Sequence, residues 1–261
     1  MALTWLRELW RYRELFYFFA LRDVKIRYRQ TLLGVLWAVV PPIFTMVVFS
    51  ILFGGIVKVP TDGMPYPVFY YAALLPWTYF QTTLGLSGNS LISNAHLITK
   101  IYFPRVILPV TPVLVGLLDF MIGFVLLIAM MLFYEIVPTW RLMLWPVLLF
   151  LLALLTFTLG MFLSALNVKY RDVKYVIPFF IQLLLFITPI IYPASLVPEP
   201  FRLFVSLNPL TGIIEAFRTT CFPEQQIDWL ALGISTIITL LLLVVSAIYF
   251  RKTEDYFSDV I

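Results

Sequence analysis

The sequence predicts an all-α integral membrane protein with six transmembrane helices and both termini in the cytoplasm. Three observations carry this prediction: 62% of the 261 residues are hydrophobic, only 12% are charged, and six long windows hold almost no ionisable side chain. A soluble domain carries about 25% charged residues, so this chain lacks the polar surface that contact with water requires. A transmembrane helix needs roughly 20 mostly apolar residues, and each window is long enough to supply one.

The windows define the boundaries of the spans. We predict an amphipathic interface helix over residues 1–29 and a transmembrane domain over residues 30–261, with spans at about 32–57, 66–93, 106–134, 142–168, 175–197 and 229–250. The second window is long enough for a helix with an interfacial extension. The segment from Pro198 to Asp228 has no apolar run of spanning length. Because Pro209 and Gly212 divide that segment, we expect a pair of short external or re-entrant helices there.

The distribution of basic residues sets the orientation. Fourteen of the 18 Lys and Arg residues fall in the N-terminal segment, the second and fourth loops and the C-terminal tail, and only four fall in the opposite loops. Loops rich in Lys and Arg stay in the cytoplasm, so both termini are predicted to be cytoplasmic. The net charge of +4 reflects this topology, and no nucleic-acid partner is predicted.

The N-terminal segment is predicted to lie on the membrane surface as a helix. Apolar residues between positions 5 and 10 recur at helical spacing with Arg between them, which suits a helix in the lipid headgroup layer. Residues 22–29 nearly alternate between polar and apolar, but a lone strand beside a membrane would leave its edges unpaired. The basic residues of this interface helix are Arg22, Lys25, Arg27 and Arg29, of which Arg22, Lys25 and Arg29 would share one face. The alternative is that these charges only fix the topology and bind anionic lipid.

The stretch Asn94–Pro109, NAHLITKIYFPRVILP, is a short basic interruption between two long apolar windows. Lys100 and Arg105 are expected at the water boundary, with Phe103-Pro104 breaking the backbone between them. A membrane protein that responds to a cytoplasmic partner needs such an element: short, rigid, basic and joined to two spanning helices. We therefore predict that this loop receives a signal from a partner.

Aromatic residues make up 17% of the chain, and several fall within the second span. Belts of Trp and Tyr at the two membrane surfaces do not explain such a cluster inside one helix. A path lined by aromatic rings would let sugar rings stack and slide, whereas packing or lipid contact is the alternative interpretation. The candidate path residues are Trp37, Phe44, Tyr70, Tyr71, Trp77, Tyr79, Phe80 and Asp119.

Asp119 is an acid in the middle of the third span. Intramembrane acids usually face a cavity or a partner, and the alternative is a protonated carboxyl that hydrogen-bonds to a neighbouring helix. The spans contain no second acid or base to accompany it, so a proton relay is not predicted.

Prolines are expected to interrupt two of the spans. Pro41-Pro42 in the first span, and Pro178, Pro189 and Pro193 in the fifth, remove backbone hydrogen bonds. Such interruptions are tolerated at membrane depth where the backbone lines a cavity or is buried in protein.

The external segment carries two opposite charges three residues apart, Glu215 and Arg218. Side chains at this spacing can pair on one face of a helix. We interpret them either as a local salt bridge or, together with Asn208 and Pro209, as parts of an external gate.

Several chemistries are excluded by composition. Cys221 is the only cysteine and His96 the only histidine, so no cysteine cluster or histidine-based metal site can form. The chain has no Gly-Lys dipeptide and hence no phosphate-binding loop, and no catalytic constellation can be assembled. The chain is not expected to hydrolyse ATP, and uphill transport would need energy from a partner.

Four blocks of the sequence resemble the ABC-2 type polysaccharide export permeases, and they occur in that family's order. They are DVKIRYRQTLLGVLWAVVPP at 23–42, LITKIYFPRVILP at 97–109, LNVKYRDVKYVIPFFIQLLLFITPIIYP at 166–193 and LNPLTGIIEAFR at 207–218. In the family these blocks form the start of the first span, the first cytoplasmic loop, the fourth–fifth loop with the fifth span, and the external segment before the sixth span. The similarity covers most of the chain.

The resemblance implies the membrane subunit of an exporter that moves a lipid-linked polysaccharide across the bacterial inner membrane. A homodimer would form the pore, and two cytoplasmic ATPase subunits, which bind ATP and Mg, would drive it; this chain itself would hold no cofactor. We expect O antigen as cargo, with capsular polysaccharide, teichoic acid, a drug or a lipid as alternatives. Two alternatives from other functional classes are a membrane-embedded glycosyltransferase and a passive channel. The glycosyltransferase would need catalytic acids that the spans lack, and the channel would work without an ATPase.

The resemblance also assigns the residues that contact the ATPase. The coupling element comprises Ala95, His96, Leu97, Lys100, Phe103, Pro104 and Arg105, and a second cytoplasmic contact or brace comprises Tyr170, Arg171 and Asp172.

Overall fold

The computed structural model describes residues 12–28, 34–61, 63–254 and 257, and every regular element within these ranges is a helix. The predicted all-helical class is confirmed for this part of the chain. The elements are α2 (Arg13–Tyr28), η1 (Gly34–Ala38), α3 (Val40–Phe49), the π-helical η2 (Ser50–Ile56), α4 (Tyr66–Ser93), α5 (Ala95–Ile98), α6 (Ile107–Phe133), η3 (Trp140–Leu144), α7 (Trp145–Lys169), α8 (Val173–Ile187), η4 (Ala194–Leu196), α9 (Glu199–Ser206), α10 (Pro209–Thr220) and α11 (Trp229–Glu254).

Four helical stretches of the described residues are long and apolar enough to cross a membrane: Leu36–Ile56, Ile107–Phe133, Trp140–Lys169 and Trp229–Glu254. The chain is therefore a multi-pass membrane protein. Two further helices have one of the two properties. α4 has 28 residues, about 42 Å at 1.5 Å per residue, but is less apolar, whereas α8 is apolar but has only 15 residues.

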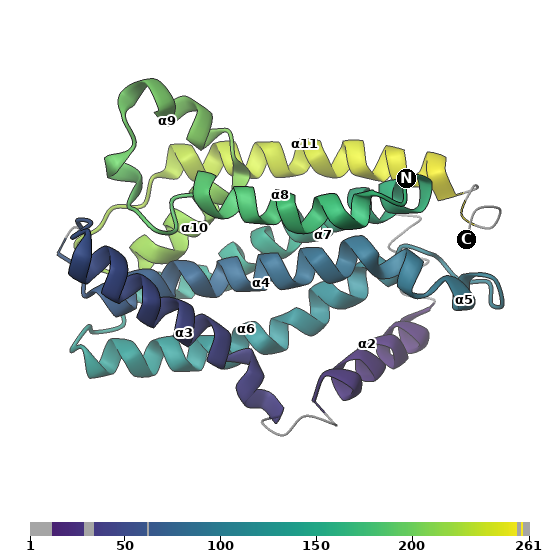
Figure 1. Cartoon of the computed structure of the whole chain (residues 1–261), viewed down its shortest axis with the longest axis horizontal. Coiled ribbons are helices and arrows are strands. Elements are labelled where there is room, and N and C mark those ends of the chain that lie inside the picture. The colour runs from purple at the N-terminus through teal and green to yellow at the C-terminus, as the bar shows by residue number, and fades with distance from the viewer. Residues whose placement is uncertain (1–11, 29–33, 62, 255–256, 258–261) are drawn as a thin grey trace.

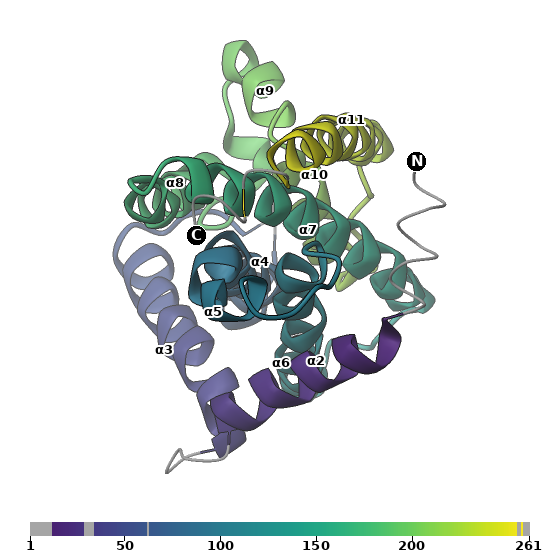
Figure 2. The ribbon, with the colours of Figure 1, turned by 90° about the vertical axis from the view of Figure 1, so that its right-hand side faces the viewer.

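The helix α4 forms the centre of the bundle. It packs against α3, α6, α7, α8 and α10, and Figure 2 shows it in the middle of these helices when viewed along the bundle. Small residues allow two of these neighbours to approach closely. A Cβ added at Gly116 of α6 would overlap the hydroxyl of Thr83, and one added at Gly160 of α7 would overlap that of Ser87. Most of the polar and aromatic side chains of α4 are thereby enclosed by other helices, whereas Gln81, Thr82 and Ser93 are exposed.

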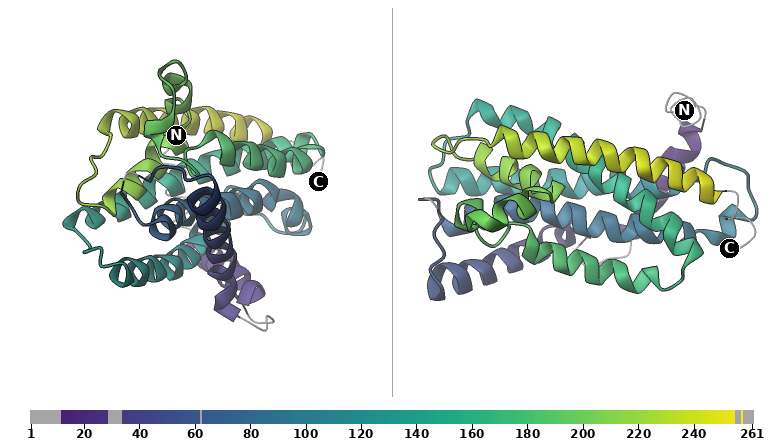
Figure 3. Two further views of the ribbon diagram at one scale, coloured as in Figure 1. Left: turned by 60° about the vertical axis from the view of Figure 1, so that its left-hand side comes forward. Right: turned by 90° about the horizontal axis from the view of Figure 1, so that it is seen from above.

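The connections gather at the two ends of the bundle. Figure 1 shows α5 and the C-terminal end of α11 at one end, and α9 and α10 toward the other. In Figure 3, the right-hand view shows α11 running along the length of the bundle between these ends. The second loop and the last helix therefore reach the same end, as the predicted distribution of basic residues requires.

One local expectation was wrong. Gly212 does not divide the external segment, because it lies inside the continuous helix α10, where a Cβ would overlap the carbonyl oxygen of Ala231. Pro178 lies in the second turn of α8 and lacks the N–H of a helical hydrogen bond, but the helix continues past it. α8 ends at Ile187, two residues before Pro189, in agreement with the predicted interruption of the fifth span by prolines.

Candidate functional site

The basic loop between α4 and α6 presents an exposed tip on a buried base. Lys100, Ile101 and Tyr102 are exposed, and Tyr102 has 90% of its surface accessible. Phe103 is buried, and its ring centroid lies 5.7 Å from that of Phe19 in α2. An aromatic and an aliphatic side chain held in water at a loop tip are available for contact with another protein. We refer to residues 95–105 as the coupling loop.

The residues of the predicted coupling element differ in exposure and in their contacts. His96 is exposed, while Ala95, Leu97 and Pro104 are partly buried. Arg105 is partly buried. Its guanidinium donates a hydrogen bond to the backbone carbonyl of Glu254 and lies 5.7 Å from the ring centroid of Phe257, so it fastens the loop to the C-terminal end of α11.

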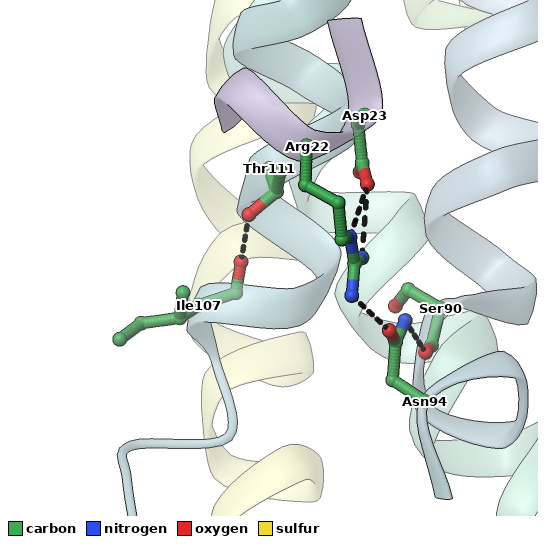
Figure 4. A network of polar contacts seen from close by, with 6 residues as sticks. All are labelled: Arg22, Asp23, Ser90, Asn94, Ile107 and Thr111. Atoms are coloured by element: carbon green, nitrogen blue, oxygen red, sulfur yellow. Dashed lines mark hydrogen bonds and ion pairs between the residues drawn. The ribbon is translucent and has the colours of Figure 1, made fainter. Parts of the chain in front are cut away.

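The interface helix α2 is hydrogen-bonded to the start of the coupling loop (Figure 4). Arg22 Nη1 donates to Asn94 Oδ1 at 3.0 Å, and Asn94 Nδ2 donates to the carbonyl of Ser90 at 2.8 Å. Asp23 holds the same guanidinium at 2.9 Å. Asn94 ends α4 and precedes α5, so this contact joins α2 to the junction between the two helices.

A second set of polar contacts joins the end of α2 to the middle of α6. Arg27 forms an ion pair with Asp119, and the hydroxyl of Tyr28 donates a hydrogen bond to the same carboxylate. Asp119 thus accepts hydrogen bonds from the interface helix, a partner that neither sequence interpretation named. Lys25 points to the exposed face, and Arg29 lies outside the described residues.

The paired residues border a cavity of about 540 Å³ between α2, α3, α4 and α6. Of the predicted path residues, Trp37, Trp77, Tyr79 and Asp119 line it. Its other polar lining residues include Thr78, Gln81 and Thr82 of α4.

The remaining aromatic candidates lie elsewhere in the described conformation. Tyr70, Tyr71 and Phe80 have no exposed surface within the single chain, and Phe44 is 68% exposed on α3. Tyr71 donates a hydrogen bond to the carbonyl of Gly123 at 3.3 Å, so this phenol packs α4 against α6. A role for these four residues along a path stays a prediction.

The second predicted contact forms the turn between α7 and α8. Tyr170, Arg171 and Asp172 are all exposed there. Behind this turn, Asn167 Nδ2 donates to the carbonyl of Gly88 at 3.1 Å and to Asn89 Oδ1 at 3.0 Å. The turn is thereby fixed to α4, the helix that leads into the coupling loop.

The predicted gate residues hold α10 against the end of α8. The guanidinium of Arg218 is fully buried, pairs with Glu215, and donates to the carbonyl of Pro189 at 2.8 Å. Asn208 caps α10 by accepting from the Leu210 N–H at 3.1 Å, and donates to Thr188 Oγ1 at 2.8 Å. Pro209 opens the helix at its first position, where its missing N–H is not needed. The charge pair predicted from spacing is confirmed, and it also joins two helices.

Sequence reasoning missed the residues that join these elements. Phe19, Tyr28 and Asn94 carry no signal in an isolated sequence, because their partners are distant along the chain. Tyr102 carries no signal either, because Tyr beside basic residues is common at the ends of membrane spans.

These features define a multi-pass membrane protein with an anchored, exposed loop at one end of its bundle and a largely apolar cavity, with a few polar side chains, near the middle of α4 and α6. Comparison with known families identifies it further: residues 14–222 match the model described as ABC-2 type transporter. The chain belongs to this family.

Characterised relatives align along almost the whole chain. The O-antigen export system permease protein RfbA of Myxococcus xanthus is 30% identical over 260 residues, which cover 97% of this chain and 98% of the relative. The protein of the same name from Klebsiella pneumoniae is 28% identical over 244 residues, 92% of each chain. The polysialic acid transport protein KpsM of Escherichia coli is 23% identical over 249 residues, covering 90% of this chain and 92% of the relative. The chain is thus the membrane permease subunit of an ABC transporter, a subunit that does not itself hydrolyse ATP.

Proposed function

We propose that this chain is the permease subunit of an ATP-driven exporter that moves a lipid-linked polysaccharide across the bacterial inner membrane. The first candidate cargo is O antigen. The observation that carries the proposal is the alignment with O-antigen export permeases over 97% and 92% of the chain. Since helices, loops and external segment are all included, the similarity extends to the parts that would bind partner and cargo.

The proposed assembly is a homodimer with six spans per copy and two cytoplasmic ATPase subunits that bind ATP and Mg. Four spans satisfy the criteria of length and apolarity by themselves. α4 supplies the fifth, because most of its polar side chains are covered by neighbouring helices. α8 with the turn after it supplies the last, since Ile190 and Ile191 are buried beyond its final residue. With six spans, both termini and the coupling loop would lie on the same side of the membrane, and the excess of Lys and Arg in these segments supports the cytoplasmic side.

The coupling loop is suited to transmit ATPase movement to the membrane. Its exposed tip offers Lys100 and Tyr102 to a partner, while buried Phe103 rests on Phe19 of α2. A displacement of the tip would therefore move α2 and, through Arg27, the wall of the mid-depth cavity. The exposed turn at residues 170–172 supplies the second contact.

The external end would act as the gate. The bond between Arg218 and the carbonyl of Pro189 closes α10 onto the end of α8. Opening requires this contact to separate, and the aromatic path residues would then pass sugar rings outward.

A second candidate cargo is a capsular polysaccharide. The similarity to the KpsM transport protein over 90% of the chain favours it, although identity is lower than to the O-antigen permeases. A lipid or drug is the third candidate.

The test is affinity purification of the tagged chain from its native membrane. Co-purification of a stoichiometric ATPase and a lipid-linked glycan is expected, and the glycan identifies the cargo class. An ATPase without glycan would point to a lipid or drug. Recovery of neither would overturn the proposal. A Lys100→Ala/Arg105→Ala variant should lose glycan export, and normal export with normal assembly would remove the coupling role.

A further inference from the structure

We propose that the mid-depth cavity between α2, α3, α4 and α6 is a binding site for an uncharged sugar unit of the translocated glycan. The inference rests on the proposed function and specifies its substrate class. It is drawn from three properties of the cavity: its depth, the side chains of α4 that line it, and its charge.

The cavity lies in the middle of the membrane-spanning region. Gln81 is near the middle of α4 (Tyr66–Ser93), and Asp119 is near the middle of α6 (Ile107–Phe133). Both Gln81 and Thr82 are exposed within the single chain. A polar side chain that meets hydrocarbon without a hydrogen-bond partner costs several kcal/mol. This face of α4 therefore requires a polar neighbour at a depth where lipid offers none.

The lining of the cavity has the chemistry of a carbohydrate site. Thr78, Gln81 and Thr82 fall on one face of α4, because residues three and four apart are neighbours on a helix. Within the described part of the chain none of the three makes a side-chain hydrogen bond, so their donors and acceptors are available to sugar hydroxyls. Trp37 and Trp77 add aromatic surface beside this polar row. An apolar wall with a few convergent polar groups is the usual composition of a ligand pocket.

The charge of the cavity selects an uncharged ligand. Arg27 and Asp119 are the charged residues among the described lining, and they pair with each other. Binding of a carboxylate or phosphate commonly uses an arginine whose guanidinium is free to pair with it. Here the guanidinium is already neutralised, so an acidic sugar would have to break the Arg27–Asp119 pair. A hydroxyl-rich neutral unit would not.

The first experiment locates the glycan. A photo-cross-linking amino acid is placed at Thr82, and at Val125 as a control, which is 69% exposed on α6 but does not line the cavity. The permease is expressed with its ATPase in cells that make a neutral O antigen. A periodate-sensitive adduct is expected at position 82 and not at 125. Export without an adduct at 82, or equal adducts at both positions, would overturn the site.

The second experiment tests the charge. The same complex is supplied with a neutral glycan and with one whose repeat contains a uronic acid. Export of the acidic glycan is expected to be at least 10-fold slower, and Asp119→Asn, which releases Arg27, should reduce this ratio. Equal export of both glycans overturns the selectivity. Export of neither by an assembled complex would instead defeat the proposed function, and the site would fall with it.

Discussion

Arg22 and Asn94 join the interface helix to the coupling loop through a hydrogen bond of 3.0 Å between Nη1 and Oδ1 (Figure 4). The same helix touches the loop at Phe103 through Phe19, and touches the helix after the loop through Arg27 and Asp119. α2 is therefore attached before, within and after the loop. Three attachments define a rigid arrangement, so the loop and the interface helix should move as one unit.

The Arg22–Asn94 bond should be measurable by a double-mutant cycle. Arg22→Ala, Asn94→Ala and the double variant are expected to show a coupling of about 1 kcal/mol in thermal unfolding, reduced from the range for charged hydrogen bonds because Arg22 is 36% exposed. Glycan export should fall in each variant while the ATPase stays bound. Strictly additive effects would show that α2 is held by its other contacts alone.

The Arg27–Asp119 pair should tolerate reversal better than truncation. Asp119→Ala leaves Arg27 without its partner in a mostly buried position, and a loss of about 2 kcal/mol in unfolding free energy is expected. The exchanged variant Arg27→Asp/Asp119→Arg should recover part of this loss. Glu135→Gln, on the exposed loop after α6, is the control with unchanged stability. No recovery in the exchange would mean that the Tyr28 contact determines the geometry.

Substitutions at the tip and at the base of the coupling loop should have different effects, the first on ATPase binding and the second on stability. Tyr102→Ala removes a side chain that is 90% exposed, so folding should be unaffected and ATPase binding should weaken by about 10-fold, as for an aromatic interface anchor. Phe103→Ala empties a buried position and should destabilise the permease by about 3 kcal/mol. Thermal unfolding and pull-down of the ATPase separate the two. Normal binding by Tyr102→Ala would move the contact elsewhere.

Gly212 should be intolerant of a methyl group, whereas Gly233 should accept one. A Cβ at position 212 would overlap the carbonyl of Ala231 and approach Ser235 Oγ, so α10 must shift away from α11. Overpacking of this kind costs about 1–3 kcal/mol. At Gly233 a Cβ meets nothing within 4 Å, and Gly233→Ala should be neutral or stabilising because alanine favours helix. Melting temperatures of the two variants give the comparison, and equal values would contradict it.

Glu215 and Arg218 should be replaceable together but not singly. Arg218→Met leaves the Glu215 carboxylate beside a buried face, and we expect a loss of about 3 kcal/mol. Adding Glu215→Gln should restore much of the stability. Export by the stable double variant tests the gate: if closure depends on the bond to Pro189, small solutes should leak through it. If small solutes do not leak through the double variant, the pair is a structural salt bridge and not part of a gate.

The positions of helices could be predicted because charge-free windows and helix lengths are local properties. The ends of α4 and α6 lie within one residue of the predicted spans 66–93 and 106–134. The end of α8 at Ile187 lies two residues before Pro189, one of the prolines predicted to interrupt the fifth span. Gly212 was misread because glycine serves both to end a helix and to bring two helices together, and only the neighbouring Ala231 distinguishes these uses.

Features of the candidate site could be predicted where their residues lie in one segment of the chain. They could not be predicted where a contact joins two distant segments. That Lys100 lies in an exposed loop between two long helices could be predicted from that segment alone, and its role in coupling stays a prediction. The Arg27–Asp119 pair joins residues separated by 92 positions, and sequence spacing says nothing about such a contact. Burial of Tyr70 and Tyr71 was likewise invisible, because an aromatic residue suits a path, a lipid surface or a packed core.

The central position of α4 has a consequence for how the protein is made. Most of its Tyr, Thr and Ser side chains are compatible with the membrane because other helices shield them. Four of these neighbours, α6, α7, α8 and α10, are synthesised after it. A nascent chain that ends soon after α4 therefore presents a helix that lipid solvates poorly, and such a helix should remain with the insertion machinery until α7 emerges. Stable integration of α4 into the membrane should therefore depend on synthesis of the later helices that enclose it.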